Sequence, residues 1–197
     1  MRRFILPLAI LAASLRVATA AEFLVRPGGE NKVVFVSKAP MERFEGKTSH
    51  LEGRIEVDPS ALGKSISVHL EVDMATLDTG IAKRNQHMRD NHLETKKFPR
   101  AVFDGATIVG PADVALVAGK PTAFEAEGTF TLHGVTRPVR LRIEATYRPS
   151  GKGGRIEFQT AFPVALADHE ISRPQFLFLK LGEVQDVRVS GVAVASP

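Results

Sequence analysis

Apolar and polar residues alternate with a period of two through most of this chain beyond residue 20. Ile66, Val68, Leu70 and Val72 are separated by polar residues, and the same spacing recurs in several later segments. Successive side chains of a β-strand point to opposite faces, so each such segment predicts a strand with one apolar and one polar face. The predicted strands are 22–25, 32–37, 53–58, 65–72, 101–109, 124–132, 139–145, 155–162 and 186–191.

This number of short strands, with turn residues between them and no internal linker, predicts an all-β fold. Antiparallel strands of this kind form sandwiches or barrels. Closure into a barrel leaves no exposed strand edges, so we expect an antiparallel β-barrel of about eight strands. One polar, helix-like excursion over residues 79–92 interrupts the series.

The first twenty residues follow a different pattern. Arg2 and Arg3 precede an apolar run that ends before Arg16, and small residues lead up to Ala20. The run is shorter than the roughly 20 residues of a membrane-spanning helix, so an uncleaved anchor is the weaker interpretation and 1–20 is predicted to be a secretory signal peptide. We therefore expect cleavage near Ala20, one mature domain over 21–197, and a periplasmic or secreted protein.

Charge and cysteine content narrow the choice of function. The formal net charge is +4, but three of the arginines lie in the predicted signal peptide, which leaves 23 basic against 22 acidic side chains. This near balance gives no indication of nucleic-acid binding. The chain has no cysteine, so disulfides, thiolate nucleophiles and cysteine-based zinc sites are excluded.

A barrel of about eight strands is either filled by its own side chains or holds one small apolar ligand. Large and small residues both occur on the predicted inward faces, and the small ones, such as Gly128 and Gly191, could either leave a lumen or fit the taper of a packed interior. The side chains predicted to line the interior, and to contact an apolar ligand there, are Phe35, Ile55, Ile66, Val68, Leu70, Phe103, Phe124, Phe130, Leu141, Phe158 and Phe162.

The helical segment collects the polar side chains that could bind the head of such a ligand. Arg84, His87 and Arg89 are the head-group candidates, and a solvated helix face with local ion pairs is the alternative. His87 and His92 are five residues apart, which does not match two metal ligands on one helical face, so no metal site is expected.

Asp168 and His169 form an acid-base pair in the sequence, but prolines flank them and they are interpreted more simply as a polar loop. The Gly-x-Ser-x-Gly pattern of a hydrolase nucleophile is absent from the sequence. We therefore expect no catalytic residues.

Three separated motifs resemble the YceI-like family of exported, lipocalin-like barrels. They are Arg-Asn-Gln-His-Met-Arg at 84–89 with Phe-Pro-Arg-Ala-Val-Phe at 98–103, the hairpin around Gly-Val-Thr-Arg-Pro-Val at 134–139, and a late loop at 171–174. The resemblance covers nearly all of the mature region. It implies a barrel whose interior binds a long-chain isoprenoid or other amphiphilic lipid, with no established catalytic site.

The resemblance also implies that an isoprenoid quinone is an alternative cargo and that a membrane cytochrome is a candidate partner; no other cofactor is expected. The sequence thus predicts an exported, non-enzymatic protein that sequesters or carries an isoprenoid-type lipid. Two alternatives remain at this point: a periplasmic interaction or stress protein with a filled barrel, and a lipid-acting hydrolase or isomerase. The oligomeric state is left open.

Overall fold

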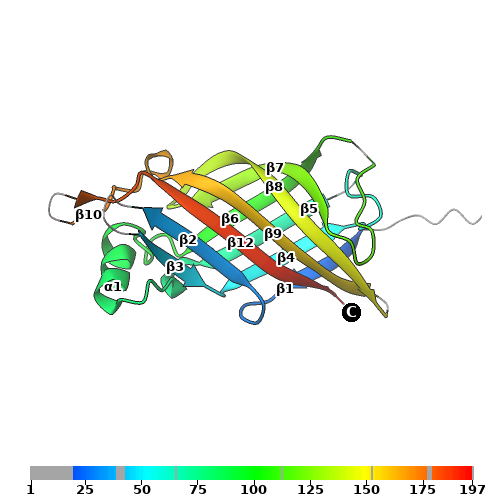
Figure 1. Ribbon diagram of the computed structural model, residues 1–197, viewed down its shortest axis with the longest axis horizontal. Helices are drawn as coiled ribbons and strands as arrows, with labels where there is room; N and C mark the ends of the chain where they lie inside the picture. The colour runs from blue at the N-terminus through cyan, green and yellow to red at the C-terminus, as the bar shows by residue number, and fades with distance from the viewer. Residues whose placement is uncertain are drawn as a thin grey trace, which may run out of the picture.

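The main body of the protein is a closed antiparallel β-barrel (Figure 1). The computed structural model describes residues 20–38, 43–64, 66–111, 113–151, 153–176 and 179–196, so the predicted signal peptide lies outside the described residues apart from Ala20. Eight strands follow one another around the barrel, and the first pairs with the last. They are β1 (Ala21–Val25), β4 (Leu51–Val57), β5 (Ile66–Asp73), β6 (Arg100–Val109), β7 (Thr122–Leu132), β8 (Val135–Ser150), β9 (Gly153–Ala165) and β12 (Val184–Ala195).

Two further strands extend the wall at one end. β2 (Lys32–Lys38) pairs with β12 beyond the stretch that pairs with β1, and β3 (Arg43–Thr48) pairs with β2. β2 therefore continues the line of β1, and β3 continues that of β4. The prediction of an antiparallel, lipocalin-like barrel of about eight strands with one short helix is confirmed.

The helical elements gather at this extended end, which we call the α1 end (Figure 1). α1 (Ala82–Asn91) and the preceding 3₁₀ helix η1 (Met74–Thr76) lie between β5 and β6, and a second 3₁₀ helix, η2 (Ala167–His169), follows β9. The short strands β10 (Gln175–Phe176) and β11 (Leu179–Lys180) form a separate hairpin beside them. None of the described helices is both long and apolar enough to cross a membrane.

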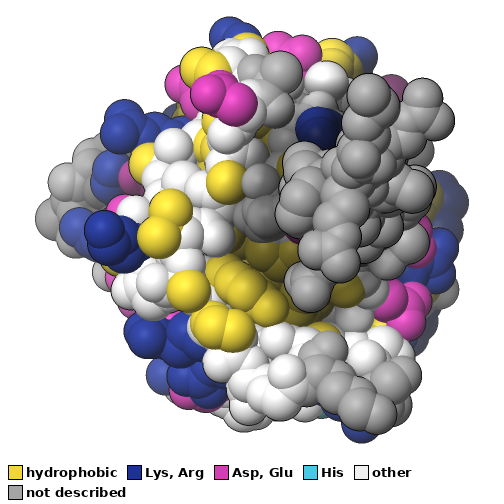
Figure 2. All heavy atoms as spheres, turned by 90° about the vertical axis from the view of Figure 1, so that its right-hand side faces the viewer, with side chains coloured by type: hydrophobic (Ala, Val, Ile, Leu, Met, Phe, Trp, Pro, Cys, Tyr) yellow, Lys and Arg dark blue, Asp and Glu magenta, His cyan; other side chains and the backbone are white. Residues whose placement is uncertain are grey.

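Two loops meet at the opposite end of the barrel. The loop between β4 and β5 and the loop between β6 and β7 are joined by hydrogen bonds from the amide of Leu62 to the carbonyl of Val114 (2.9 Å) and from the amide of Leu116 to the carbonyl of Pro59 (2.7 Å). Both leucine side chains are buried in the core. Figure 2 faces this end and shows hydrophobic side chains in a central hollow with charged side chains around its margin.

The period-two pattern decides which side chains enter the barrel. On β9, Ile156, Phe158, Thr160, Phe162 and Val164 line the interior, while the residues that alternate with them face outward. The same register places Val187 and Val189 of β12 beside them. Because every strand contributes one apolar face, the barrel encloses a continuous apolar interior.

Candidate functional site

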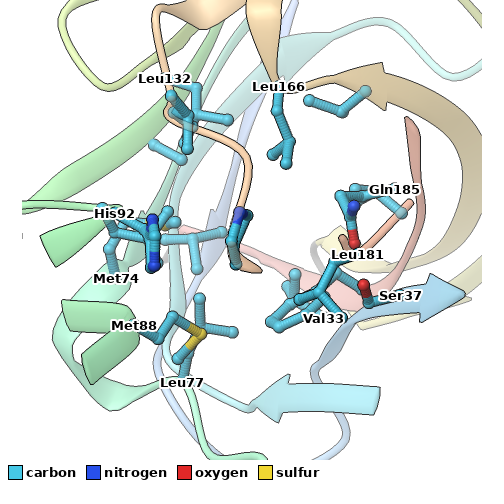
Figure 3. Close-up of a pocket in the computed structure, with 18 of the residues that line it drawn as sticks. Val33, Ser37, Met74, Leu77, Met88, His92, Leu132, Leu166, Leu181 and Gln185 are labelled. Carbon is cyan, nitrogen blue, oxygen red and sulfur yellow. The ribbon is translucent and has the colours of Figure 1, made fainter. Parts of the chain in front are cut away.

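A cavity of about 200 Å³ lies inside the barrel at the α1 end, and we call it the outer cavity (Figure 3). Its wall combines residues from β2, β7, β9 and β12 with residues from η1 and α1. Most of the lining side chains are apolar. The polar or charged ones among the described residues are Ser37, Arg84, His87, His92 and Gln185.

A second cavity of about 120 Å³, the inner cavity, lies deeper in the barrel. Its described lining is apolar apart from Thr160. The two cavities adjoin, because five side chains line both of them. These are Val72, Ala101, Phe130, Phe162 and Val189.

The two phenylalanines form the bulk of this shared wall. The rings of Phe130 and Phe162 pack edge to face, with their centroids 5.5 Å apart. Together, the two cavities make the interior hollow and mainly apolar, with most of its polar lining residues at the α1 end. This arrangement matches the form of an amphiphile with a long apolar tail.

All eleven residues predicted to line the interior do lie in a cavity wall. Phe35 lines the outer cavity, and Phe130 and Phe162 line both. The other eight line the inner cavity: Ile55, Ile66, Val68, Leu70, Phe103, Phe124, Leu141 and Phe158. Their contact with a lipid remains a prediction.

Two of the three predicted head-group residues reach the outer cavity. Arg84 and His87 line it, whereas Arg89 is not among the lining residues. The Arg84 guanidinium donates to the carbonyl and the hydroxyl of Thr79, both at 2.9 Å, and its Cζ lies 4.1 Å from the centroid of the Phe44 ring. These contacts hold Arg84 at the rim of the cavity.

Helix α1 is positioned by a buried amide rather than by an apolar face. The side chain of Asn85 donates to the carboxylate of Asp78 (2.6 Å) and accepts from the amide (2.8 Å) and the hydroxyl (2.6 Å) of Thr79. Hydrogen bonds from the Gly80 amide and from Asn85 lower the pKa of Asp78. The turn that precedes the helix is thus tied to its first turn, and the helix presents Arg84, His87 and Met88 to the cavity.

Sequence reasoning missed several lining residues at the α1 end. Met74, Leu77 and Met88 come from η1, α1 and the segment between them, where no strand period identifies an inward face. Ser37 continues the alternation of Val33 and Phe35 on β2, which could have indicated it. His92 lies at the end of the predicted helix, and its contact with the late loop, where Nδ1 lies 3.0 Å from the carbonyl of Ser172, could not be predicted from the helix alone.

Asp168 and His169, the alternative acid-base pair, lie outside both cavity walls. His169 is 4% exposed; its Nδ1 lies 3.1 Å from the carbonyl of Val135, and its ring packs on Phe130 with centroids 5.5 Å apart. This is a structural role at the base of η2. Among the described residues, no three His, Asp or Glu side chains lie close enough together to hold a metal ion.

The fold and its apolar interior define a lipocalin-like barrel, and the comparisons with known proteins give its family. The sequence profile of the YceI-like domain matches residues 26–193, so the chain belongs to the YceI-like family. A UPF0312 protein of Vibrio vulnificus is 28% identical over 170 residues, which are 83% of this chain and 85% of that protein. A UPF0312 protein of Vibrio cholerae is 26% identical over 130 residues, so this chain spans 64% of the length of that relative.

Solved structures show the same fold at lower sequence identity. A polyisoprenoid-binding domain from Saccharophagus degradans, implicated in plant cell wall breakdown, superposes with a TM-score of 0.68 at 19% identity, covering 90% of this chain and 99% of that one. BcnA of Burkholderia cenocepacia superposes with a TM-score of 0.66 at 19% identity, covering 84% and 97%.

Proposed function

We propose that this protein is an exported, non-enzymatic binding protein that sequesters or carries one isoprenoid-type amphiphilic lipid inside its barrel. The observation that carries the proposal is the pair of adjoining apolar cavities, in which all the described polar lining residues except Thr160 lie toward the α1 end. The lipid tail would run through both cavities, and its head would lie near the α1 end. The polyisoprenoid-binding description of the Saccharophagus degradans domain supports the same class of ligand.

The tail would supply most of the affinity. Burial of one CH₂ group is worth about 0.8 kcal/mol, so each five-carbon isoprene unit that leaves water contributes about 4 kcal/mol. A net hydrogen bond to the head contributes about 1 kcal/mol. A tail of a few units therefore determines whether a lipid binds, and the head determines which lipid is preferred.

Mass spectrometry of the exported protein tests this proposal. The full chain is expressed with its own N-terminus, purified without detergent, and analysed under native and denaturing conditions. We expect processing near Ala20 and one retained species of isoprenoid mass per chain. A ligand-free protein that also fails to take up added prenyl lipids would contradict the proposal and favour an interaction or stress protein.

A matched pair of variants locates the lipid. Phe130→Lys places a charge in the wall shared by both cavities, whereas Thr129→Lys places one on the outer face of the same strand. Phe130→Lys should lose the lipid while Thr129→Lys retains it. Equal retention by two folded variants would place the lipid outside the barrel. The predicted quinone cargo and cytochrome partner follow only from the family resemblance, and identification of the retained species addresses the first of them.

A further inference from the structure

Positive charge collects in residues 81–97, the segment that contains α1. Five Lys or Arg side chains lie there against two acidic ones, which gives a net charge of +3. The remainder of the predicted mature chain has 18 basic and 20 acidic side chains, which gives a net charge of −2. The small positive charge of the mature chain therefore comes from this segment at the α1 end.

Three lysines of the segment carry this charge at the surface. Lys83, Lys96 and Lys97 are exposed, and none of them makes an ion pair with a residue that the structure describes. On the barrel wall, by contrast, Arg100 lies within 3.5 Å of three carboxylates and Arg140 within 3.5 Å of two. The charge of these arginines is balanced locally, whereas the charge of the three lysines is not.

The loop after α1 is fixed against the barrel. The ring of Phe98 packs on that of His133, in the turn between β7 and β8, with centroids 4.4 Å apart. Nζ of Lys97 lies 4.6 Å from the centroid of the Phe98 ring. Lys96 and Lys97 thus follow the C-terminal end of α1 and Lys83 lies in its first turn, so the positive charge spans this helix at the end of the barrel (Figure 1).

An aliphatic side chain is exposed at the start of the same helix. Ile81, the N-cap residue of α1, is 52% exposed and precedes Lys83 by two residues. At the surface of an anionic membrane, an aliphatic group enters the boundary of the acyl chains while ammonium groups contact phosphates. Protein interfaces, in contrast, are depleted in lysine. The combination favours a membrane over a folded protein as the partner.

We infer that one surface of this protein docks on membranes that contain anionic phospholipids. We call it the α1 face, and it consists of Ile81, Lys83, Lys96 and Lys97. The inference goes beyond the proposed function, because it concerns the outer surface and not the contents of the barrel. Other residues of α1 line the outer cavity, so docking would bring the α1 end of that cavity next to the bilayer.

Sedimentation with lipid vesicles tests the inference. The exported protein is mixed with vesicles of phosphatidylcholine alone or of phosphatidylcholine with phosphatidylglycerol, and the bound fraction is measured. Each lysine near an anionic surface strengthens binding about fivefold, so three lysines predict binding about 100-fold tighter when phosphatidylglycerol is present. Added salt should reduce the difference, since it screens the charges. Equal binding to both kinds of vesicle would overturn the inference, and binding to neither would overturn it in favour of a protein partner.

A matched pair of double variants assigns the binding to the α1 face. Lys83→Gln with Lys96→Gln should weaken binding to the phosphatidylglycerol vesicles about 25-fold. Lys64→Gln with Lys120→Gln removes two exposed lysines from the loops at the opposite end of the barrel and should bind like the wild type. All four side chains are exposed, so thermal melts should show the same stability for both variants. Equal losses of binding in the two variants would overturn the assignment.

Ile81→Ser separates insertion from the effect of charge alone. It should weaken binding to the same vesicles about 3- to 10-fold. Val117→Ser changes a side chain of similar exposure (53%) in the loop between β6 and β7, and it should have no effect. Unchanged binding by Ile81→Ser would contradict insertion. A protein that binds these vesicles but retains no isoprenoid would overturn the proposed function and leave the docking inference standing.

Discussion

At the scale of single residues, two interior phenylalanine rings occupy the space beside a glycine on the adjacent strand. Gly46 lies opposite Phe35, and a Cβ at Gly46 would overlap the Phe35 ring. Gly191 lies opposite Phe158 in the same way, and a Cβ at Gly191 would lie 2.7 Å from the Phe158 ring. The inward glycines therefore accommodate rings of the adjacent strand, and the lumen results from the arrangement of the larger side chains.

Gly46→Ala tests this packing. The added methyl must displace the Phe35 ring, and overpacking of this kind costs about 1–3 kcal/mol of unfolding free energy, measured by urea denaturation. The double variant with Phe35→Leu should recover most of the loss, since the two changes share one space. Additive losses in the double variant, or no loss in Gly46→Ala, would show that the ring and the glycine are independent.

The pKa values of two histidines should be shifted in opposite directions. Hydrogen bonds to Asp104 (2.6 Å) and Glu71 (2.9 Å) raise the pKa of His69 above 6.5, whereas burial lowers that of His92. The stabilisation from His69 is present below pH 6.5 and is lost as the pH rises through its raised pKa. His92 acts oppositely: as the pH falls below 6.5, the unfolded chain takes up the proton first and stability decreases.

Nuclear magnetic resonance titration of the histidine ring protons measures both values. We expect His69 to titrate above 6.5 and His92 below it, and Asp104→Asn to lower the pKa of His69 alone. A His92 that titrates at or above 6.5 would contradict the lowering of its pKa by burial.

At the scale of elements, α1 is a polar helix that a few hydrogen bonds hold in place. The N-cap residue Ile81 makes no side-chain hydrogen bond to the helix. Asn85, which is 7% exposed, instead joins the first turn to the preceding residues through hydrogen bonds with Asp78 and Thr79. The position of α1 decides where Arg84, His87 and His92 lie. The geometry of the α1 end therefore depends on one amide.

Asn85→Ala should loosen α1. Loss of bonds to a carboxylate, an amide and a hydroxyl should cost about 2–3 kcal/mol, part of it from polar groups left unpaired. Hydrogen exchange of the α1 amides should accelerate more than that of the barrel strands. Gln86→Ala, the exposed neighbour, is the control. Unchanged α1 protection in Asn85→Ala would mean that other contacts position the helix.

The sequence was sufficient to predict the strands with clear alternation, and with them the apolar wall of the inner cavity. It did not predict β3, because Phe44 is the single apolar side chain among its inward residues; Gly46 is covered by a ring and Thr48 bonds Thr76 (2.6 Å). The polar site at the α1 end was only partly predicted. Ser37 Oγ and His92 Nε2 are buried and have no hydrogen-bond partner in the described part of the chain. A periodic sequence pattern carries no information about such partners.

At the scale of the whole molecule, the barrel combines packed and hollow regions. Phe23 is 1% exposed and its ring packs edge to face on Tyr147, with centroids 6.3 Å apart. Phe130 instead faces both cavities. The same residue type thus serves as core in one place and as a cavity wall in the other.

Phe23→Ala and Phe130→Ala should therefore differ. Removal of a fully packed ring costs about 3–5 kcal/mol, whereas removal of one that already borders empty space should cost less, about 1–2 kcal/mol. Phe130→Ala should also widen the passage between the two cavities and accept prenyl lipids with bulkier tails. Urea denaturation of the delipidated proteins compares the two costs, and equal losses would show that Phe130 is packed like the core.

The measurement that tests the central claim most directly is photo-crosslinking with a prenyl lipid that carries a diazirine at the tail end remote from its head. If the tail runs through both cavities, peptide mapping should find the label on inner-cavity residues such as Leu70, Phe124 and Ile156, and excess geranylgeraniol should prevent labelling. Label confined to outward-facing side chains, or labelling that excess geranylgeraniol leaves unchanged, would contradict the account of the barrel as a lipid-binding chamber.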